Sequence, residues 1–276
     1  MGQRRVLITG CSSGIGRSLC EEFHRRGDIV IATARQPDSI ADLQATGLHT
    51  YRLDVTQADQ IAQLVATLQQ VGLVPDVLVN NAGYGLFGPV MDLPPAAIAT
   101  QFATNVTAQV QLVQAIAPLM KAQGGGLILN IASVSSVFTT PFAGAYAGSK
   151  AALRALSEAL RMELAPFGIQ VVTVHPGAIA SKFGDNAQLP AAALPEDSWY
   201  TPIADKVQMR ATLSQQNATS SDEFARQLGQ KVDRGALPPE IWLGKKSWQL
   251  PFLKRWLPAR LLDRLQSKRF GLNTLR

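Results

Sequence analysis

Short apolar runs and longer amphipathic segments alternate along most of the chain. The apolar runs are rich in Val, Ile and Leu, as buried parallel strands are, and they cover residues 6–9, 29–33, 49–53, 77–80, 127–131 and 169–174. The segments between them have the length and periodicity of helices, and they cover residues 15–26, 58–71, 96–123 and 146–165. This alternation predicts an α/β fold with a doubly wound, mostly parallel sheet of about seven strands. Such a sheet binds its ligand at the carboxyl ends of the strands.

The periodic pattern loosens after the sixth strand but does not end there. Residues 178–216 contain three prolines and are expected to form a partly helical excursion, suited to a lid over a substrate. Ser220 is followed three residues later by Glu223, which is the spacing of a capping box and predicts a helix over residues 220–233. The apolar residues 241–243 can add one more short strand.

Basic charge is concentrated at the C-terminal end. Residues 244–276 hold nine Lys and Arg side chains against the single acid Asp263, whereas residues 1–243 hold 17 basic and 19 acidic side chains. The nearly neutral body gives no reason to expect nucleic-acid binding. We therefore expect one domain over residues 1–243, including the lid at about 178–216, followed by a basic amphipathic tail over 244–276.

The tail interleaves large apolar side chains with its basic ones between Trp248 and Phe270. Pro258 must interrupt any helix there. Two short amphipathic helices of this kind suit peripheral contact with an anionic membrane surface. A tail folded over the mouth of a substrate site, or against a second subunit, fits the same pattern, and these alternatives stay open.

The number and spacing of cysteine and histidine residues do not favour a metal site or a disulfide framework. The chain has two cysteines, Cys11 and Cys20, and three histidines without metal-ligand spacing. No cleavable apolar segment precedes the first strand, and no uncharged apolar run is long enough for a membrane-spanning helix. We therefore expect a cytoplasmic protein without a metal, with peripheral membrane association left open by the tail.

A glycine-rich turn joins the first predicted strand to the first helix. Glycine permits positive φ and lets backbone N–H groups approach a pyrophosphate closely, and the helix N-terminus adds partial positive charge. The turn therefore predicts a dinucleotide site formed by Gly10, Ser12, Ser13, Gly14, Ile15 and Gly16.

The end of the second predicted strand indicates which dinucleotide binds. A carboxylate there would accept hydrogen bonds from the ribose 2′-hydroxyl of NAD and would repel a 2′-phosphate. The chain has Arg35 and no acid at this point, and a guanidinium can pair with the phosphate. The sequence thus favours NADP(H).

Tyr146 and Lys150 are four residues apart and would share one face of a helix. Free tyrosine has a pKa of about 10, so proton exchange at neutral pH requires a lowering of about 3 units, or roughly 4 kcal/mol. One ammonium at about 4 Å in an effective dielectric of about 20 supplies that much. We therefore expect Lys150 to lower the pKa of Tyr146.

Six short motifs occur in a fixed order along residues 4–180. They are Thr9-Gly10-x-x-x-Gly14-x-Gly16, Asn80-Asn81-Ala82-Gly83, Asn105, Ser133, Tyr146-x-x-x-Lys150 and Pro176-Gly177. Each motif alone is weak, but the ordered set resembles the short-chain dehydrogenase/reductase family. The resemblance implies a single Rossmann-type domain that binds a dinucleotide and moves a hydride between it and a carbonyl or alcohol.

The same resemblance implies a role for each matched residue. Ser133 would polarise the substrate oxygen, and Tyr146 would exchange the proton. Lys150 would bind the nicotinamide ribose and tune Tyr146, while Asn105 would hold a water that links Lys150 to solvent. Further cofactor contacts would come from Asp54, Val55, Asn81, Ala82, Gly83, Tyr146, Lys150, Pro176, Gly177, Ile179 and Ser181. His175 is expected to be a packing or cofactor-adjacent residue and not a catalytic one.

The substrate is expected to be an apolar ketone or aldehyde, such as a steroid, retinal or a long-chain aldehyde. Aromatic residues that could line its pocket flank the catalytic motifs or lie in the loosened segment: Phe138, Phe142, Phe183, Trp199 and Tyr200. Within the family, the segment at Arg35 and the extended C-terminus look more like the 17β-hydroxysteroid and retinol dehydrogenase branch than like 3-oxoacyl reductases.

Other classes fit less well but define alternatives. A 3-oxoacyl-type reductase of the same family stays open. A non-catalytic NADP-sensing regulator on the same fold would be expected to lose Ser133, Tyr146 or Lys150, and all three are present. Epimerases that act on nucleotide sugars generally need a larger C-terminal substrate domain. Family members commonly form homo-oligomers, which this tail could permit or block.

Overall fold

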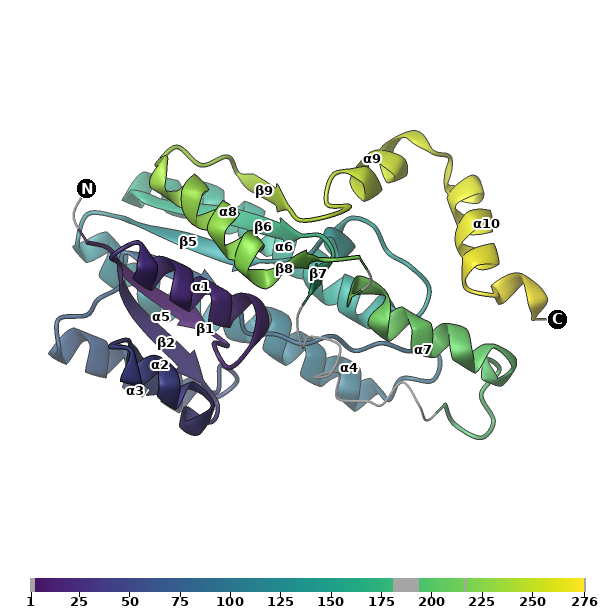
Figure 1. Cartoon of the computed structure of the whole chain (residues 1–276), viewed down its shortest axis with the longest axis horizontal. Helices are drawn as coiled ribbons and strands as arrows, with labels where there is room; N and C mark the ends of the chain where they lie inside the picture. The colour runs from purple at the N-terminus through teal and green to yellow at the C-terminus, as the bar shows by residue number, and fades with distance from the viewer. Residues whose placement is uncertain (1–2, 181–193, 216, 276) are drawn as a thin grey trace.

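Seven parallel strands form one sheet in the order β3-β2-β1-β4-β5-β6-β9 (Figure 1). The computed structural model describes residues 3–180, 194–215 and 217–275. The strands are β1 (Arg5–Thr9), β2 (Ile29–Ala34), β3 (His49–Arg52), β4 (Val77–Asn80), β5 (Gly126–Ile131), β6 (Ile169–Pro176) and β9 (Glu240–Leu243), with the short pair β7 (Ile179–Ala180) and β8 (Thr219–Ser220) beside them. The strand order reverses between β1 and β4, and a doubly wound sheet opens its ligand crevice at that point. The predicted α/β fold is confirmed.

Helices cover both faces of the sheet (Figure 1). They are α1 (Gly14–Arg25), α2 (Ala41–Ala45), α3 (Ala58–Gln70), α4 (Pro95–Phe102), α5 (Ala108–Ala122), α6 (Gly144–Leu164), α7 (Ala204–Thr212), α8 (Ser221–Asp233), α9 (Gln249–Trp256) and α10 (Ala259–Arg269). Leu19 of α1 and Leu228 of α8 belong to the core on one face. Leu64 of α3 and Ile116 of α5 belong to the core on the other.

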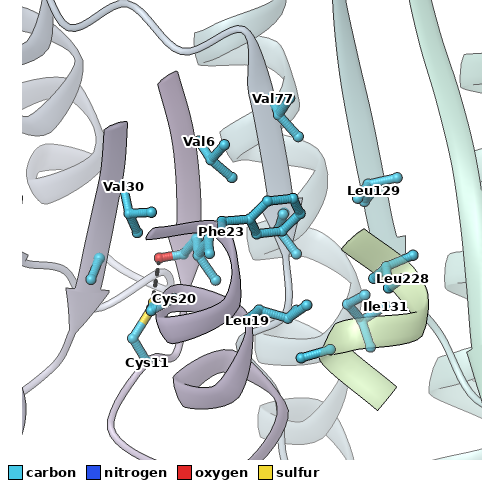
Figure 2. Close-up of a cluster of buried hydrophobic side chains, with 14 of the residues drawn as sticks. Val6, Cys11, Leu19, Cys20, Phe23, Val30, Val77, Leu129, Ile131 and Leu228 are labelled. Carbon is cyan, nitrogen blue, oxygen red and sulfur yellow. Dashed lines mark hydrogen bonds between the residues drawn. The ribbon is translucent and has the colours of Figure 1, made fainter. Parts of the chain in front are cut away.

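Figure 2 shows the core cluster between the sheet and α1. Val6 of β1 packs there with Phe23 of α1, whose side chain has no exposed surface. Burying a side chain of this size contributes about 1.5–3 kcal/mol. Leu7, the next residue of β1, belongs to the cluster on the opposite face. Because both faces are covered, the strand reads as an unbroken apolar run.

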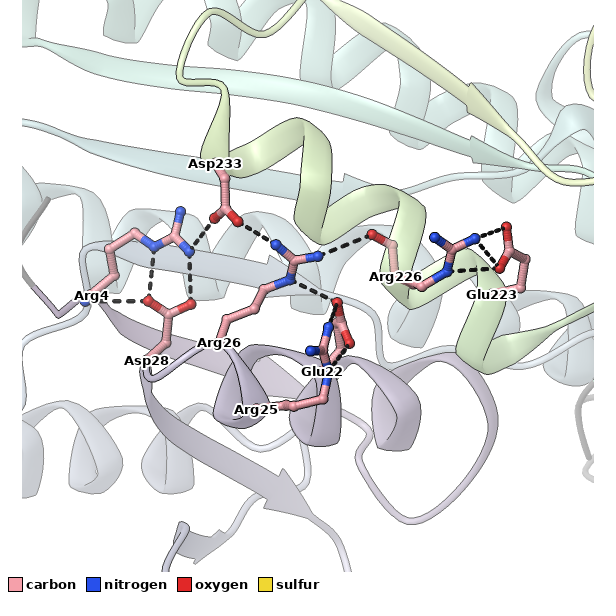
Figure 3. Close-up of polar contacts among 8 residues, drawn as sticks. All are labelled: Arg4, Glu22, Arg25, Arg26, Asp28, Glu223, Arg226 and Asp233. Carbon is pink, nitrogen blue, oxygen red and sulfur yellow. Dashed lines mark hydrogen bonds and ion pairs between the residues drawn. The ribbon is translucent and has the colours of Figure 1, made fainter.

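Ion pairs fasten α8 to the beginning of the sheet (Figure 3). Arg4, just before β1, donates to Asp28 at 2.8 Å and to Asp233 at 2.7 Å. Arg26, at the end of α1, donates to Glu22 at 2.7 Å and also to Asp233. Single exposed pairs stabilise a fold little, but this network joins residues 229 positions apart. It fixes the helix that leads into β9 and the tail.

The long helix predicted over residues 96–123 is divided into two. A π-helical turn (Ala103–Thr107) separates α4 from α5. It contains Asn105, and such turns are frequent at functional sites. The single helix predicted over residues 96–123 is therefore corrected to two helices joined by this turn.

The C-terminal part follows the sequence prediction in outline. The Ser220 hydroxyl accepts a hydrogen bond from the Glu223 N–H at 3.1 Å and so caps α8, but the Glu223 carboxylate accepts from Arg226. β9 pairs in parallel with β6, which confirms the last predicted strand. α9 and α10 are separated at Pro258. Part of the predicted lid, including Phe183, lies outside the described residues.

The end of the tail packs against the body of the protein. Phe270 follows α10 and is fully buried, with its ring in edge-to-face contact with Phe142 at a centroid distance of 6.0 Å. Ile203 and Val207 complete this small cluster. None of the helices that the structure describes is long and apolar enough to cross a membrane.

Candidate active site

A cavity of about 720 Å³ opens at the carboxyl ends of the strands. Residues that follow β1, β2, β3, β4, β5 and β6 line it, together with α6, α7 and the tail. This is the crevice that a doubly wound sheet offers to a ligand. The sequence-predicted residues that line it are Gly10, Ser12, Ser13, Gly14, Ile15, Arg35, Asp54, Val55, Asn81, Ala82, Gly83, Ser133, Tyr146, Lys150, Pro176, Gly177 and Ile179.

The glycine-rich turn has the shape of an anion cradle. Gly10 has a φ of +72°, and a Cβ added there would lie 2.9 Å from the Ala82 Cα. Ser13 caps α1 with extended backbone and makes no side-chain capping hydrogen bond, so its side chain leaves the N–H groups of the first turn available. A pyrophosphate fits this arrangement of amides and small residues.

Gly16 supports the cradle from behind and does not line the cavity. A Cβ added there would collide with the Gly10 carbonyl oxygen and lie 2.5 Å from Asn81 Nδ2. Asn81 Nδ2 itself donates to the Thr9 carbonyl oxygen at 2.8 Å. Thr9 Oγ1 in turn accepts from the N–H groups of Asn81 and Ala82, both at 3.0 Å. These bonds fix the ends of β1 and β4 against each other.

The end of the cavity beside β2 and β3 has one cation and one carboxylate. Arg35 follows β2 with its side chain exposed at the cavity wall. Asp54 follows β3, and its carboxylate accepts from the N–H and hydroxyl of Thr56 at 3.0 and 2.7 Å. The Asp54 carboxylate is therefore held in place by its own turn.

Ser133, Tyr146 and Lys150 meet at the same wall of the cavity. Ser133 follows β5, and its hydroxyl oxygen accepts from the Ser135 N–H at 3.0 Å. Tyr146 and Lys150 lie on α6 and are both buried. The Lys150 ammonium donates to the Ile131 carbonyl oxygen at 2.7 Å. A hydroxyl, a phenol and an ammonium thus lie at one wall of the cavity.

The electrostatics of this wall differ from the expectation in one respect. Burial raises the pKa of Tyr146 above its usual value, while a hydrogen bond from Ser133 and the charge of Arg210 act in the opposite direction. The residue expected to lower the pKa of Tyr146 is Lys150. Lys150 is itself desolvated, which lowers its pKa to about 8, and its ammonium donates to a backbone carbonyl. In the chain by itself burial thus outweighs the influences that lower the pKa of Tyr146, and the tuning of the phenol by Lys150 stays a prediction.

Asn105 lies one layer behind the cavity and has no exposed surface. Its Nδ2 donates to the Tyr84 carbonyl oxygen at 3.0 Å and to Ser149 Oγ at 3.1 Å. Its Oδ1 accepts from the Tyr84 N–H at 3.1 Å. A Cβ added to Gly83 would lie 2.9 Å from Asn105 Oδ1 and 3.7 Å from Lys150 Nζ. Asn105 is thus near Lys150, and its role in holding a water stays a prediction.

His175 packs behind Ser133. It is fully buried and stacks on Trp242 with ring centroids 3.9 Å apart. Its Nδ1 lies 3.2 Å from the Ser133 carbonyl oxygen and 3.1 Å from Ser136 Oγ. Burial lowers its pKa. The packing role expected from the sequence agrees with these contacts.

The aromatic residues predicted to line a substrate pocket divide into several groups. Phe138 lines the cavity, whereas Phe142 and Tyr200 pack against each other with centroids 5.7 Å apart and do not reach it. Trp199 is 75% exposed and also lies away from it. Ser181, expected to contact the carboxamide, is outside the described residues.

Several lining residues had no signal in the sequence. They come from the loop after β4, from α7 and from the tail, and they include Tyr84, Phe87, Arg210, Leu250 and Arg269. Segments so far apart in sequence converge only through tertiary packing. A buried arginine in an amphipathic helix cannot be told from an exposed one by spacing.

Comparison with known proteins places the chain in a family. The family model described as short chain dehydrogenase matches residues 4–190. Short-chain dehydrogenase RED1 of Pyricularia oryzae is 34% identical over 275 residues, which cover 99% of this chain and 96% of that protein. A short-chain dehydrogenase from Streptomyces avermitilis has a TM-score of 0.81 at 30% identity, over 99% of this chain and 97% of that one.

Two solved neighbours of similar fold were determined with a nicotinamide cofactor bound. A short chain dehydrogenase from Burkholderia cenocepacia, solved with NADP, has a TM-score of 0.76 at 22% identity over 95% of this chain and 97% of that one. Another neighbour was solved with NAD. The fold and the motif residues at the cavity agree with these matches. The chain belongs to the short chain dehydrogenase family of nicotinamide-dependent oxidoreductases.

Proposed function

We propose that this protein reduces a ketone or aldehyde with NADPH. The observation that carries the proposal is the meeting of Ser133, Tyr146 and Lys150 at one wall of the cavity, between the glycine cradle and an end that α7 and the tail close. A non-catalytic sensor of NADP would have no use for this set. An NADP(H) enzyme usually works with a largely reduced cellular pool, which favours the reductive direction.

The roles of the side chains follow from the charge that develops on the substrate oxygen. When bound, the reduced nicotinamide supplies the hydride that adds to the carbonyl carbon. Tyr146 would give its proton to the oxygen, and Ser133 would donate a hydrogen bond to the same oxygen. The Lys150 ammonium would stabilise the resulting phenolate until it regains a proton from solvent. The products are an alcohol and the oxidised cofactor, so atoms and electrons balance.

Arg35 supports the preference for NADP(H) over NAD(H). It follows β2 at the cavity wall, and the nearest lining carboxylate in sequence, Asp54, is held by its own turn. A guanidinium there would pair with the 2′-phosphate. Removing it by Arg35→Ser should reduce kcat/KM with NADPH by roughly tenfold to hundredfold. kcat/KM with NADH should change little.

The substrate end of the cavity supports an apolar carbonyl compound. Its described lining includes Phe87, Phe138, Leu213 and Leu250. Binding sites for small molecules are typically apolar with a few placed polar groups. We therefore infer a lipophilic ketone or aldehyde, such as a steroid, retinal or a long-chain aldehyde.

The tail supports peripheral contact with a membrane that would deliver such a substrate. Trp248, Phe252 and Trp256 are 69%, 63% and 67% exposed, beside the basic Lys254 and Arg255. Aromatic and cationic side chains together suit an anionic lipid surface. Sedimentation with phosphatidylserine vesicles at low salt, but not with phosphatidylcholine vesicles, is the expected result. Equal recovery of the protein in the supernatant with both kinds of vesicle would reject the membrane contact.

The experiment that tests the reaction follows NADPH and NADH consumption in parallel. The purified protein is offered steroids, retinal, long-chain aldehydes and small ketones. Turnover of lipophilic carbonyls with NADPH preferred is the expected result. Equal rates with NADH would reject the role of Arg35 and leave the Tyr146 chemistry standing. Turnover of only small polar carbonyls would reject the lipophilic substrate.

A further inference from the structure

The cavity carries positive charge beyond that of Arg35 and Lys150. The described lining includes one carboxylate, Asp54, and several basic side chains: Arg35, Lys150, Arg210, Lys246 and Arg269. Arg35 and Lys150 are accounted for by the cofactor. The other three come from α7, the residues after β9 and the end of α10, all on the substrate side.

Arg210 is held close to the reacting centre. It is only 6% exposed, and its Nε donates to Thr140 Oγ1 at 2.6 Å. Its guanidinium carbon lies 4.8 Å from the centroid of the Phe87 ring. The other neighbour of that ring is Tyr146, at a centroid distance of 5.6 Å. Arg210 is thus separated from the phenol by one aromatic ring.

This buried cation has no counter-ion in the part of the chain that the structure describes. No described Asp or Glu forms an ion pair with Arg210 or with Arg269, whereas Arg4 and Arg26 are each paired with carboxylates. Burial lowers the pKa of Arg210 to about 10, against the opposing effect of the Tyr146 phenolate and together with the charge of Arg269. Leaving a desolvated cation without an anion is unfavourable. Such a cost at a cavity wall indicates a binding function.

Arg269 reaches the same cavity from the opposite end of the chain. Its neighbour Phe270 is fully buried against Phe142 and anchors the end of α10. Arg269 itself keeps an exposed side chain and lines the cavity. A ligand that contacts both arginines would therefore bridge α7 and the tail.

We propose that the carbonyl substrate carries an anionic group, a carboxylate or a phosphate, that Arg210 binds and Arg269 covers from the tail. This inference rests on the proposed function, because it places the carbonyl at Ser133 and Tyr146. A planar guanidinium binds both kinds of anion through paired hydrogen bonds. The apolar lining would take the rest of the molecule. The anionic group is unchanged by the reaction and serves only to orient the substrate.

The first test compares an anionic carbonyl compound with its neutral ester. The probes are 4-formylbenzoate, its methyl ester and 4-formylphenyl phosphate, each reduced with NADPH. Wild type should reduce an anion with a kcat/KM roughly tenfold or more above that of the ester. Whether the carboxylate or the phosphate is the better substrate identifies the anionic group.

Substitutions then assign the preference to the arginines. Arg210→Met should abolish the roughly tenfold preference for the anion over the ester. The effect of losing a charge near Tyr146 on proton transfer is common to both substrates, so the ratio of their kcat/KM values isolates binding of the anionic group. Arg269→Gln should have a smaller effect, because that side chain is exposed. The matched control is Arg264→Gln, which removes the same charge from α10 at a position that does not line the cavity. Arg264→Gln should leave kcat/KM unchanged for both the anion and the ester.

A binding measurement keeps the test independent of turnover. Benzoate and phenyl phosphate are titrated by calorimetry into protein saturated with NADP⁺. Binding should be seen with wild type and with Arg210→Lys, and should be lost in Arg210→Met. If anions bind no better than benzyl alcohol, or if Arg210→Met binds them as wild type does, the inference is overturned.

Ester turnover would then leave the proposed reaction standing. Anion binding that depends on Arg210, without turnover of any probe, would reject the proposed reaction alone.

Discussion

The two ends of the cavity are built in different ways. The cofactor end consists of backbone and small residues at strand ends, such as Gly10, Ala82 and Gly83, tied together by hydrogen bonds of Thr9 and Asn81. The substrate end consists of large side chains from α7, the loop after β4 and the tail, such as Arg210 and Leu250. The first end is a rigid part of the sheet, whereas the second is assembled from segments that meet only in the folded chain.

Because of this difference, substitutions at the two ends are expected to have different structural effects. A change in the cradle moves the backbone of the sheet, because Gly16 contacts the Gly10 carbonyl without space for a methyl group. A change at the substrate end moves one side chain and leaves the sheet intact. One fold can therefore keep its cofactor while its substrate changes. Substitutions that affect one end and not the other test this view.

The largest expected effect comes from Tyr146→Phe. Loss of the proton donor should reduce kcat by about 10³-fold, within the range for general acid catalysis. The dissociation constant of NADPH, measured by fluorescence titration, should change by less than about threefold, because the hydroxyl makes little contribution to the cradle. Activity close to that of wild type would reject Tyr146 as the proton donor.

The next effect should come from the cradle. In Gly16→Ala the new methyl group must displace the turn, and overpacking of this kind costs about 1–3 kcal/mol. The dissociation constant of NADPH should therefore rise by roughly tenfold to hundredfold. The matched control is Gly148→Ala on α6, where the added Cβ meets only Phe102 at an ordinary 3.6 Å. Equal NADPH affinity in both variants would contradict the assignment of the cradle.

A smaller effect should follow from releasing the tail. Phe270→Ala removes the buried ring that holds α10 against Phe142. KM for the carbonyl substrate should rise by roughly tenfold as the end of the tail loosens, and the melting temperature should fall by several degrees. NADPH affinity should stay as in wild type. Phe252→Ala, at a position 63% exposed on α9, is the control and should change none of these quantities. A loss of NADPH affinity in Phe270→Ala would show that the two ends are not independent.

The smallest effect concerns pH. Burial lowers the pKa of Lys150 to about 8, so its ammonium is present below that pH and is lost above it. Because the charge stabilises the phenolate, kcat/KM for reduction should fall about fourfold between pH 7 and pH 8.5. Lys150→Arg, whose side chain keeps its charge, should be less active but should lack this decline. A rate that stays level to pH 9 in wild type would show that the Lys150 charge is not needed.

Much of the cofactor end could be predicted from the sequence. The positions of Asp54, Asn81 and the trio Ser133, Tyr146 and Lys150 were indicated by the resemblance of the ordered motifs to the family. The doubly wound parallel sheet and the glycine turn depend on short-range patterns and on the rule that parallel strands end at one edge. Arg35 was also found in this way, because its position relative to a strand end is local. These features lie in the segment that the family model matches.

Several details of the site could not be read in this way. Asn105 lies in a π turn that interrupts the single helix expected over residues 96–123. The pKa of Tyr146 depends on burial and on Arg210, which lies 64 residues later in the chain. Aromatic residues near the catalytic motifs were expected to line the pocket, but Phe142 packs instead against Phe270 at the end of the tail.

The sequence by itself determined the α/β fold, which follows from the alternation of apolar and amphipathic segments. It also indicated the cofactor cradle through the glycine-rich turn, and Tyr146 as the proton donor through the ordered motifs that resemble the family. The tertiary structure alone decided which side chains face the substrate. Arg210 and Arg269 meet there because Phe270 is buried against Phe142. Burial of apolar surface is non-directional and acts between any segments that can pack. Local sequence patterns therefore do not indicate which distant segments the burial of apolar surface brings together.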